Sequence, residues 1–181
     1  MRLFVAVDMP AEVKEKLASL QTAIPGVRWL PAEQLHLTLV FLGEIEPENL
    51  DGLCSALAAI AVPPFTLTFD RTGCFPHPGA PKVLWAGVKQ QPALAGLALL
   101  VREAAESCGI KTDERPFSPH ITLGRSRQPA SCTAADFSKQ LISDKKLSIP
   151  VLSFILYQSR LTQQGAIHEA IREFRLSASI E

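Results

Sequence analysis

Runs of apolar residues predict strands along this chain, and apolar residues at helical spacing predict the helices between them. The expected strands lie at residues 2–8, 35–42, 65–70, 82–88, 120–125 and 149–158. Helices are expected after Pro10, after Pro47 and over 92–109, where Gly109 is suited to end the helix. A further helix is predicted over 133–142, and a last strand over 165–176.

The predicted elements occur in the same order twice, which indicates an internal duplication. Residues 1–72 and 82–158 both follow the order strand, helix, strand, helix, strand, and the Pro- and Gly-rich segment 73–81 is the expected loop between them. An 84-residue offset relates His36 to His120 and also carries the strand at 65–70 onto 149–154. This period is too long for a solenoid repeat.

The duplication predicts one two-lobed domain over residues 1–181, with the tail strand at 165–176 added to it. Its fold class is α+β with pseudo-twofold symmetry. Two mainly antiparallel sheets would face a central cleft, and the helices would lie outside.

Composition narrows the class of protein. The chain has 181 residues, 47% of them hydrophobic and 20% charged, which is typical of a folded globular domain. Its formal net charge is zero, but the balance is −3 over residues 1–110 and +3 over 111–181, which favours an anionic substrate near the C-terminal part. No apolar run has the length of a signal-peptide core or membrane span, so a cytoplasmic protein is expected. The four cysteines have no CxxC spacing and are interpreted as packing residues.

Two of the four histidines begin the same kind of tetrapeptide. These are His-Leu-Thr-Leu at 36–39 and His-Ile-Thr-Leu at 120–123. On a strand, residues two apart point to the same face, so each motif places an imidazole beside a hydroxyl and turns its apolar residues to the core. If the two halves pack about a pseudo-twofold axis, both imidazoles and both hydroxyls converge on one small anion.

That set of groups suits phosphodiester cleavage. One histidine can take a proton from water while the other gives a proton to the leaving oxygen. Thr38 and Thr122 can donate hydrogen bonds to the phosphate oxygens, and Arg125 is a candidate charged donor. Two proton-transfer groups suffice for a strained cyclic phosphate, whereas an unstrained diester usually recruits metal ions.

The two histidines admit other interpretations. Each could be a core residue, although the paired motif makes that interpretation weaker. They could also bind a metal, but no carboxylate accompanies either histidine on its strand, so no metal and no cofactor are expected. His77 lies in the predicted loop, and His168 either lines the cleft or is exposed.

The motifs and their order resemble the two-histidine phosphoesterases, and within them the RNA 2',3'-cyclic phosphodiesterases, which are also called 2'-5' RNA ligases. The matching segments are RLFVAVDMP at 2–10, LHLTLVFLGE at 35–44, VLWAGV at 83–88, RPFSPHITLGR at 115–125 and LYQSRLTQQGAIHE at 156–169. The resemblance implies hydrolysis of RNA 2',3'-cyclic phosphate ends to a 2'-phosphate. In that reaction His36 is the proton donor, His120 is the proton acceptor, and Thr38, Thr122 and Arg125 contact the phosphate.

The resemblance also sets expectations about partners. The expected substrate is RNA with a 2',3'-cyclic phosphate end, tRNA-like fragments among the candidates, and the expected state is a monomer. One departure is His168, where the family leads us to expect tyrosine, which puts base stacking by the tail strand in doubt.

Three other functions are compatible with parts of the sequence to different degrees. Residues 111–114, Lys-Thr-Asp-Glu, lack the glycine of an adenylated-lysine motif, which counts against ATP-dependent ligation. Weak, reversible 2'-5' joining without ATP could occur in the same site. The alternative that is not an enzyme is a non-catalytic module that binds RNA ends.

Overall fold

The computed structural model describes residues 1–21, 24, 26–75, 82–113, 115–126, 147–163 and 165–178. The helices are α1 (Ala11–Ala18), α2 (Leu50–Ala58) and α3 (Pro92–Ser107), with 3-10 turns η1 (Ala32–Gln34) and η2 (Pro47–Asn49). The strands are β1 (Arg2–Asp8), β2 (Val27–Trp29), β3 (His36–Glu44), β4 (Phe65–Phe75), β5 (Lys82–Val88), β6 (His120–Ser126), β7 (Ser148–Val151), β8 (Ser153–Thr162) and β9 (Gly165–Arg175).

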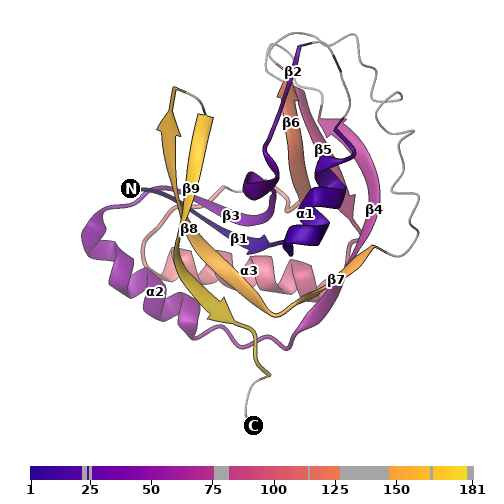
Figure 1. Cartoon of the computed structure of the whole chain (residues 1–181). Coiled ribbons are helices and arrows are strands. Elements are labelled where there is room, and N and C mark those ends of the chain that lie inside the picture. Colours follow the sequence, from indigo (N-terminus) through magenta and orange to yellow (C-terminus); the bar gives the residue numbers. More distant parts are fainter. Residues whose placement is uncertain are drawn as a thin grey trace.

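The strands form one antiparallel path in the order β7-β4-β5-β6-β3-β1-β8-β9, with β2 paired to β6 beside β3 (Figure 1). The α+β class with mainly antiparallel strands is therefore confirmed. The two expected sheets are joined at their edges, because Leu37 on β3 pairs with Ile121 on β6. Within the described residues, this is the one pair that joins the two strands, so the two halves of the sheet meet over a short joint.

The strand order is symmetric about that joint. On one side β6 is followed by β5 and β4, and on the other β3 is followed by β1 and β8. Each side thus takes two strands from one half of the chain and a third strand from the other half. This arrangement agrees with the predicted pseudo-twofold duplication, which stays a prediction.

Alternation of side chains along β3 and β6 positions the core. Leu37, Leu39, Ile121 and Leu123 are each at most 5% exposed and belong to the main hydrophobic core. Helices α2 and α3 pack together below the sheet, and α3 also contacts β3 (Figure 1). The opposite faces of β3 and β6 are thereby left for polar side chains. Within the described residues, no helix is both long and apolar enough to cross a membrane.

Three expectations about elements need correction. The single strand expected over 149–158 is two strands, β7 and β8, which separate at Leu152 because β7 pairs with β4 whereas β8 pairs with β1 and β9. The loop expected over 73–81 begins later, because β4 continues to Phe75 along β5, and Gly73 lies against the ring of Trp85. Strand β2 was not expected, since three residues are too short to show alternation.

The helix expected over 133–142 lies outside the described residues.

Candidate active site

The two HxT motifs meet at the joint of the sheet. Because Leu37 pairs with Ile121, the antiparallel register places His36 across from Thr122 and Thr38 across from His120. All four side chains lie on the face opposite the buried Leu37 and Ile121, which we call the histidine face. Diagonal positions of this kind are about 7–8 Å apart in antiparallel sheets, so both imidazoles can reach one phosphate.

Both imidazoles are oriented by the same local hydrogen bond. Nδ1 of His36 lies 2.7 Å from the carbonyl oxygen of Gln34, and Nδ1 of His120 lies 2.7 Å from that of Ser118. A carbonyl can only accept a hydrogen bond, so Nδ1 carries the proton in both rings. Nε2 is therefore the atom through which each ring can accept or donate a proton.

Burial controls the charge of His36. Desolvation, followed by the charge of the neighbouring His168, lowers the pKa of His36 to about 4. The hydrogen bond to the Gln34 carbonyl and the charge of Asp8, which pairs with His36 in the β1–β3 register, act in the opposite direction. In the free protein at neutral pH, His36 is therefore neutral, and an anion beside it would favour its protonated form.

His120 is shifted in the same direction by a similar environment. Burial lowers the pKa of His120, the Ser118 carbonyl opposes that effect, and the charge of Arg125 lowers the pKa again. Arg125 is therefore near enough to His120 for its charge to act on the imidazole. Both rings thus begin as neutral imidazoles in a site that has a cation nearby.

An aromatic layer lies beneath His36. Phe4 on β1 is 3% exposed and stacks at 4.9 Å from the ring of His36 and at 5.2 Å from the ring of Tyr157 on β8. His168 on β9 meets the rings of Phe4 and His36 edge-on, at 5.0 Å and 5.2 Å. Burial also raises the pKa of Tyr157, so its hydroxyl stays protonated.

His168 was left open by the sequence, and the structure places it beside His36. Its Nδ1 is buried and has no hydrogen-bond partner among the residues described, and burial lowers its pKa. His168 is therefore a third imidazole at the site. His77 lies outside the described residues.

The other half of the site has a smaller aromatic support. Phe75, at the end of β4, meets the ring of His120 edge-on at 4.9 Å and lies 5.2 Å from the ring of Trp85. Each histidine therefore has a phenylalanine against it that comes from a neighbouring part of the sheet. Neither Phe4 nor Phe75 was expected at the site, because both lie in apolar runs that also suit the core.

A β-bulge in β6 changes which residues share the histidine face. Thr122 pairs with Trp85 and Gly124 pairs with Leu84, so two consecutive residues of β5 face residues two apart on β6. Leu123 is the extra residue, and beyond a bulge the alternation of side chains shifts by one position.

Arg125 reaches the histidine face because of this bulge. It is five residues from His120, and strict alternation would turn it to the opposite face. After the bulge it pairs with Val83, which is two residues from Trp85 and on the same face. The sequence prediction that Arg125 accompanies His120 thus acquires a structural reason.

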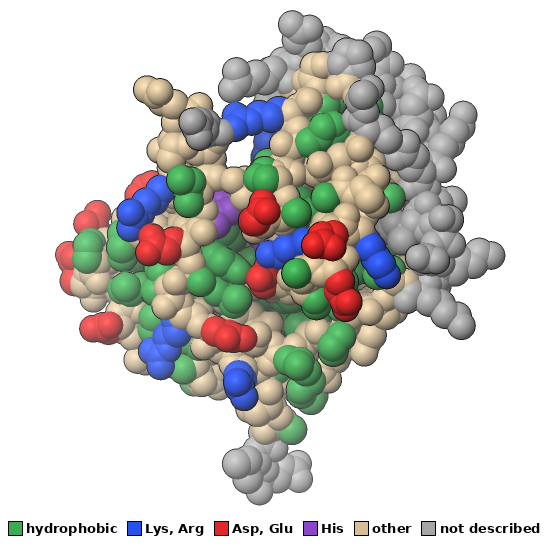
Figure 2. Space-filling view, in the orientation of Figure 1, with side chains coloured by type: hydrophobic (Ala, Val, Ile, Leu, Met, Phe, Trp, Pro, Cys, Tyr) green, Lys and Arg blue, Asp and Glu red, His purple; other side chains and the backbone are tan. Residues whose placement is uncertain are grey.

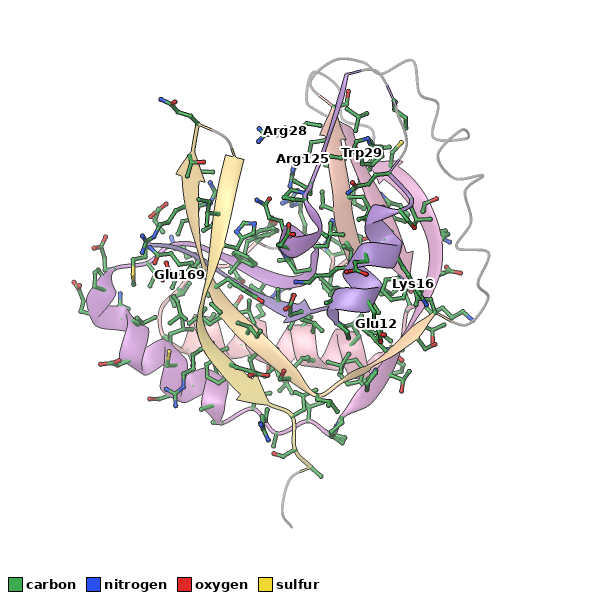
Figure 3. The ribbon with its side chains drawn as sticks, in the orientation of Figure 1. Glu12, Lys16, Arg28, Trp29, Arg125 and Glu169 are labelled. Atoms are coloured by element: carbon green, nitrogen blue, oxygen red, sulfur yellow. The ribbon has the colours of Figure 1, made fainter. Side chains whose placement is uncertain are left out.

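Arg28 is a further residue on this face that sequence reasoning did not single out. It pairs directly with Arg125 in the β2–β6 register, and Figure 3 shows the two side chains near each other between β2 and the β8–β9 hairpin. No sequence motif marks Arg28, because the short strand that carries it is recognisable only from its pairing with β6.

Potential metal ligands do not cluster in the part of the chain that the structure describes. No group of three or more histidine, cysteine, aspartate or glutamate side chains there could hold a metal ion. The side chains on the histidine face are suited to proton transfer and to hydrogen bonding of an anion.

Known proteins are similar to this chain in architecture and in sequence. The family model for LigT-like phosphoesterases matches residues 7–85 and 88–168, one stretch in each half. An RNA 2',3'-cyclic phosphodiesterase of Archaeoglobus fulgidus is 36% identical over 177 residues, which cover 96% of this chain and 99% of the relative. One from Escherichia coli K12 is 40% identical over 133 residues, which cover 71% of this chain and 74% of the relative.

A solved structure agrees with this relationship. The crystal structure of E. coli LigT complexed with 3'-AMP matches with a TM-score of 0.81 at 32% identity, and the match covers 97% of both chains. The family model, the sequence relatives and the shared fold agree over most of the chain. This chain therefore belongs to the LigT-like phosphoesterases.

Proposed function

We propose that this protein is an RNA 2',3'-cyclic phosphodiesterase that opens the cyclic phosphate to leave a 2'-phosphate. The observation that carries the proposal is the register at the joint, which sets two imidazoles and two threonines on one face. The names of the A. fulgidus and E. coli relatives support the reaction, and the E. coli LigT complex with 3'-AMP supports a nucleotide ligand.

The reaction requires a base and an acid on opposite sides of phosphorus. His120 accepts a proton at Nε2 from the attacking water, and the water oxygen forms the new bond to phosphorus. The bond from phosphorus to the 3'-oxygen breaks, and His36 donates the proton on its Nε2 to that oxygen. His120 gains one proton and His36 loses one, so proton exchange with solvent restores both rings to their starting states.

The charge on the substrate prepares His36 for its role. A cyclic phosphate diester is an anion, and an anion close to His36 opposes the effect of burial and raises its pKa. His36 therefore becomes the acid on binding substrate. His120 lies close to Arg125, whose charge favours the neutral imidazole that a base requires.

Three side chains are proposed to stabilise the phosphate in the transition state. Thr38 and Thr122 lie across from the two histidines in the register, so their hydroxyls can donate to the non-bridging oxygens. Arg125 follows on the same face and can donate two parallel hydrogen bonds through its planar fork. No metal is required for these steps, since strain in the five-membered ring activates the diester.

The direct test is product analysis of an RNA oligonucleotide with a 2',3'-cyclic phosphate end. Chromatography against 2'-phosphate and 3'-phosphate standards should give only the 2'-phosphate, with no product from a protein lacking both imidazoles. A 3'-phosphate product would overturn the assignment of the leaving oxygen. Adding an RNA with a 5'-hydroxyl end tests whether the same site also joins ends without ATP.

A further inference from the structure

Two arginines lie directly opposite each other on the histidine face, beyond the two HxT motifs. Arg28 pairs with Arg125, and the β6 bulge places this pair on the same face as His120 and Thr122. Arg125 is three residues past Thr122, a distance of at most about 10 Å along a strand. The pair is therefore an extension of the site.

The arginine pair has no balancing carboxylate in the described part of the chain. No ion pair is formed there by either guanidinium, and both side chains are exposed. Like charges directly opposite on neighbouring strands destabilise a sheet. An anion between or beside the two groups would relieve that repulsion, and a phosphate matches the fork of donors on each guanidinium.

The side chain of Arg28 is confined by the β8–β9 hairpin. A methyl group built on Gly165 would lie 2.7 Å from Nη2 of Arg28, so the guanidinium lies directly against the backbone at the hairpin tip. The hairpin is linked to η1 by a 2.7 Å hydrogen bond from Nε2 of Gln34 to the carbonyl oxygen of Ala166. In Figure 2, blue arginine or lysine atoms span the gap at this place, and purple histidine atoms are visible below them.

These contacts define where Arg28 can act. Gln34 links His36 to the hairpin, because its carbonyl accepts from His36 and its side chain donates to Ala166. The hairpin tip in turn limits the movement of Arg28. Arg28 is thus a positioned cation at the edge of the site, across from Arg125, which follows Thr122 on β6.

We infer that Arg28 binds the phosphodiester on the 5' side of the terminal nucleotide, so that the site recognises RNA ends in preference to cyclic mononucleotides. The inference rests on the proposed function, which assigns the reacting phosphate to the histidines and threonines. An RNA chain then brings one further phosphate past that position, and Arg28 lies across from Arg125 on the same face, beside the hairpin tip.

The experiment compares three substrates that differ in their second phosphate. They are a 2',3'-cyclic mononucleotide, the same nucleotide with a 5'-phosphate, and a trinucleotide with a cyclic end. Arg28→Ala should lower kcat/KM at least about tenfold on the two substrates with a second phosphate and leave the plain mononucleotide unchanged. Arg28→Lys should recover part of the loss, because lysine keeps the charge without the fork.

Salt dependence provides a second measurement. Loss of one phosphate contact should reduce the slope of log(kcat/KM) against log salt by about 0.7 for the trinucleotide. Arg160→Ala is the matched control, because Arg160 is also an exposed hairpin-side arginine but pairs with Glu169 at 3.1 Å. This control should leave both the rates and the salt slope unchanged.

The outcomes separate the inference from its alternatives. Equal losses on all three substrates would assign Arg28 to the reacting phosphate, and no loss on any would exclude it from binding; either result overturns the inference. A loss on the trinucleotide alone would indicate a base or ribose contact and would also overturn it. Thermal unfolding of each variant checks that the fold is retained.

A binding experiment keeps the inference distinct from the proposed function. Dissociation constants are measured for oligonucleotides that end in a 2'-phosphate, with the wild type and Arg28→Ala. Absence of turnover by the wild type contradicts the proposed function. A dissociation constant that Arg28→Ala leaves unchanged contradicts the inference.

Discussion

At the scale of single residues, the site depends on two imidazoles held in the same way. Each donates from Nδ1 to the carbonyl two residues earlier, and this local contact directs Nε2 to the substrate side of the ring. Burial against aromatic rings then lowers the pKa values of both, His36 more strongly, with its value at about 4. In the proposed mechanism the two rings have different roles, His36 as the acid and His120 as the base.

Replacing either imidazole should abolish most of the activity. His36→Ala and His120→Ala should each lower kcat at least about 10²-fold, since each removes one proton transfer. The double variant should lower kcat by a smaller factor than the product of the two single factors, because the two groups act as a unit. Steady-state kinetics on a cyclic-ended RNA tests this, with circular dichroism to check folding. Full activity in either single variant would exclude the mechanism.

The pKa shifts also predict the pH dependence. In the free protein, one limb of the kcat/KM profile should lie near the pKa of about 4 for His36 and the other below 6.5, so its maximum is acidic. In the complex the anionic phosphate raises both pKa values, so the maximum of kcat should lie at higher pH. Identical maxima for kcat and kcat/KM would contradict this account.

His168 offers a specific variant for the same profile. It lowers the pKa of His36, so His168→Phe, which keeps an aromatic ring in place, should move the acid limb of kcat/KM to higher pH. Phe41→Leu is a suitable control outside the imidazole pair, because Phe41 is exposed and its ring lies 6.2 Å from that of Phe4. An unmoved acid limb would show that His168 does not act on His36.

At the scale of elements, the bulge in β6 decides the composition of the site. It returns Arg125 to the histidine face, and the β2–β6 pairing sets Arg125 across from Arg28. The β8–β9 hairpin contributes Tyr157 and His168 and is tied to η1 through Gln34. The histidine face and its surroundings are therefore assembled from elements far apart in the sequence.

The role of Arg125 follows from that geometry. Arg125→Ala should lower kcat/KM by at least about tenfold through loss of a charge-assisted contact to phosphate. Arg125→Lys should recover only part of the activity, because a lysine cannot donate two parallel hydrogen bonds. Arg71→Ala, an exposed arginine on β4 paired with Asp70 at 3.7 Å, is the control. A wild-type kcat/KM in Arg125→Ala would place this residue outside the site.

At the scale of the whole molecule, the two halves of the sheet meet where the chemistry is located. Each half supplies one histidine and one threonine, and the pair Leu37–Ile121 joins them. Both joint residues are fully buried. The stability of the fold and the alignment of the site therefore depend on the same contact.

Weakening the joint should destabilise the whole protein. Ile121→Ala should lower the free energy of unfolding by about 2–5 kcal/mol, since it leaves a cavity in a closely packed core. Ile167→Ala, at a site that is 56% exposed, should change it by at most about 0.5 kcal/mol. Urea denaturation gives both values. Equal effects of the two substitutions would mean that Ile121 does not hold the joint.

The reaction should not depend on divalent cations. The two halves bring imidazoles, hydroxyls and a guanidinium to the substrate, and proton transfer with hydrogen bonding can open a strained ring. Dialysis against EDTA should therefore leave kcat/KM unchanged. Activity that is lost on dialysis and restored by a divalent ion would contradict the proposal.

The sequence by itself determined the local half of this site. Strand alternation put His36 with Thr38 and His120 with Thr122 on common faces, because side-chain direction along a strand is set by the backbone. It also predicted most strands and the α+β class, since apolar periodicity reflects burial. The sequence predicted one strand over 149–158 where the structure has β7 and β8, and it did not predict β2. Both differences arise because the strands that pair with these segments lie far away in the chain.

Only the tertiary structure decided how these local pieces combine. The antiparallel pair Leu37–Ile121 sets the two motifs against each other, and the bulge at Leu123 turns Arg125 to their face. Arg28 carries no sequence signal because it belongs to no motif, and the sequence left open whether His168 lines the site or is exposed. Their positions arise from strand pairing and hairpin packing, which depend on contacts between residues distant in sequence and therefore leave no local pattern.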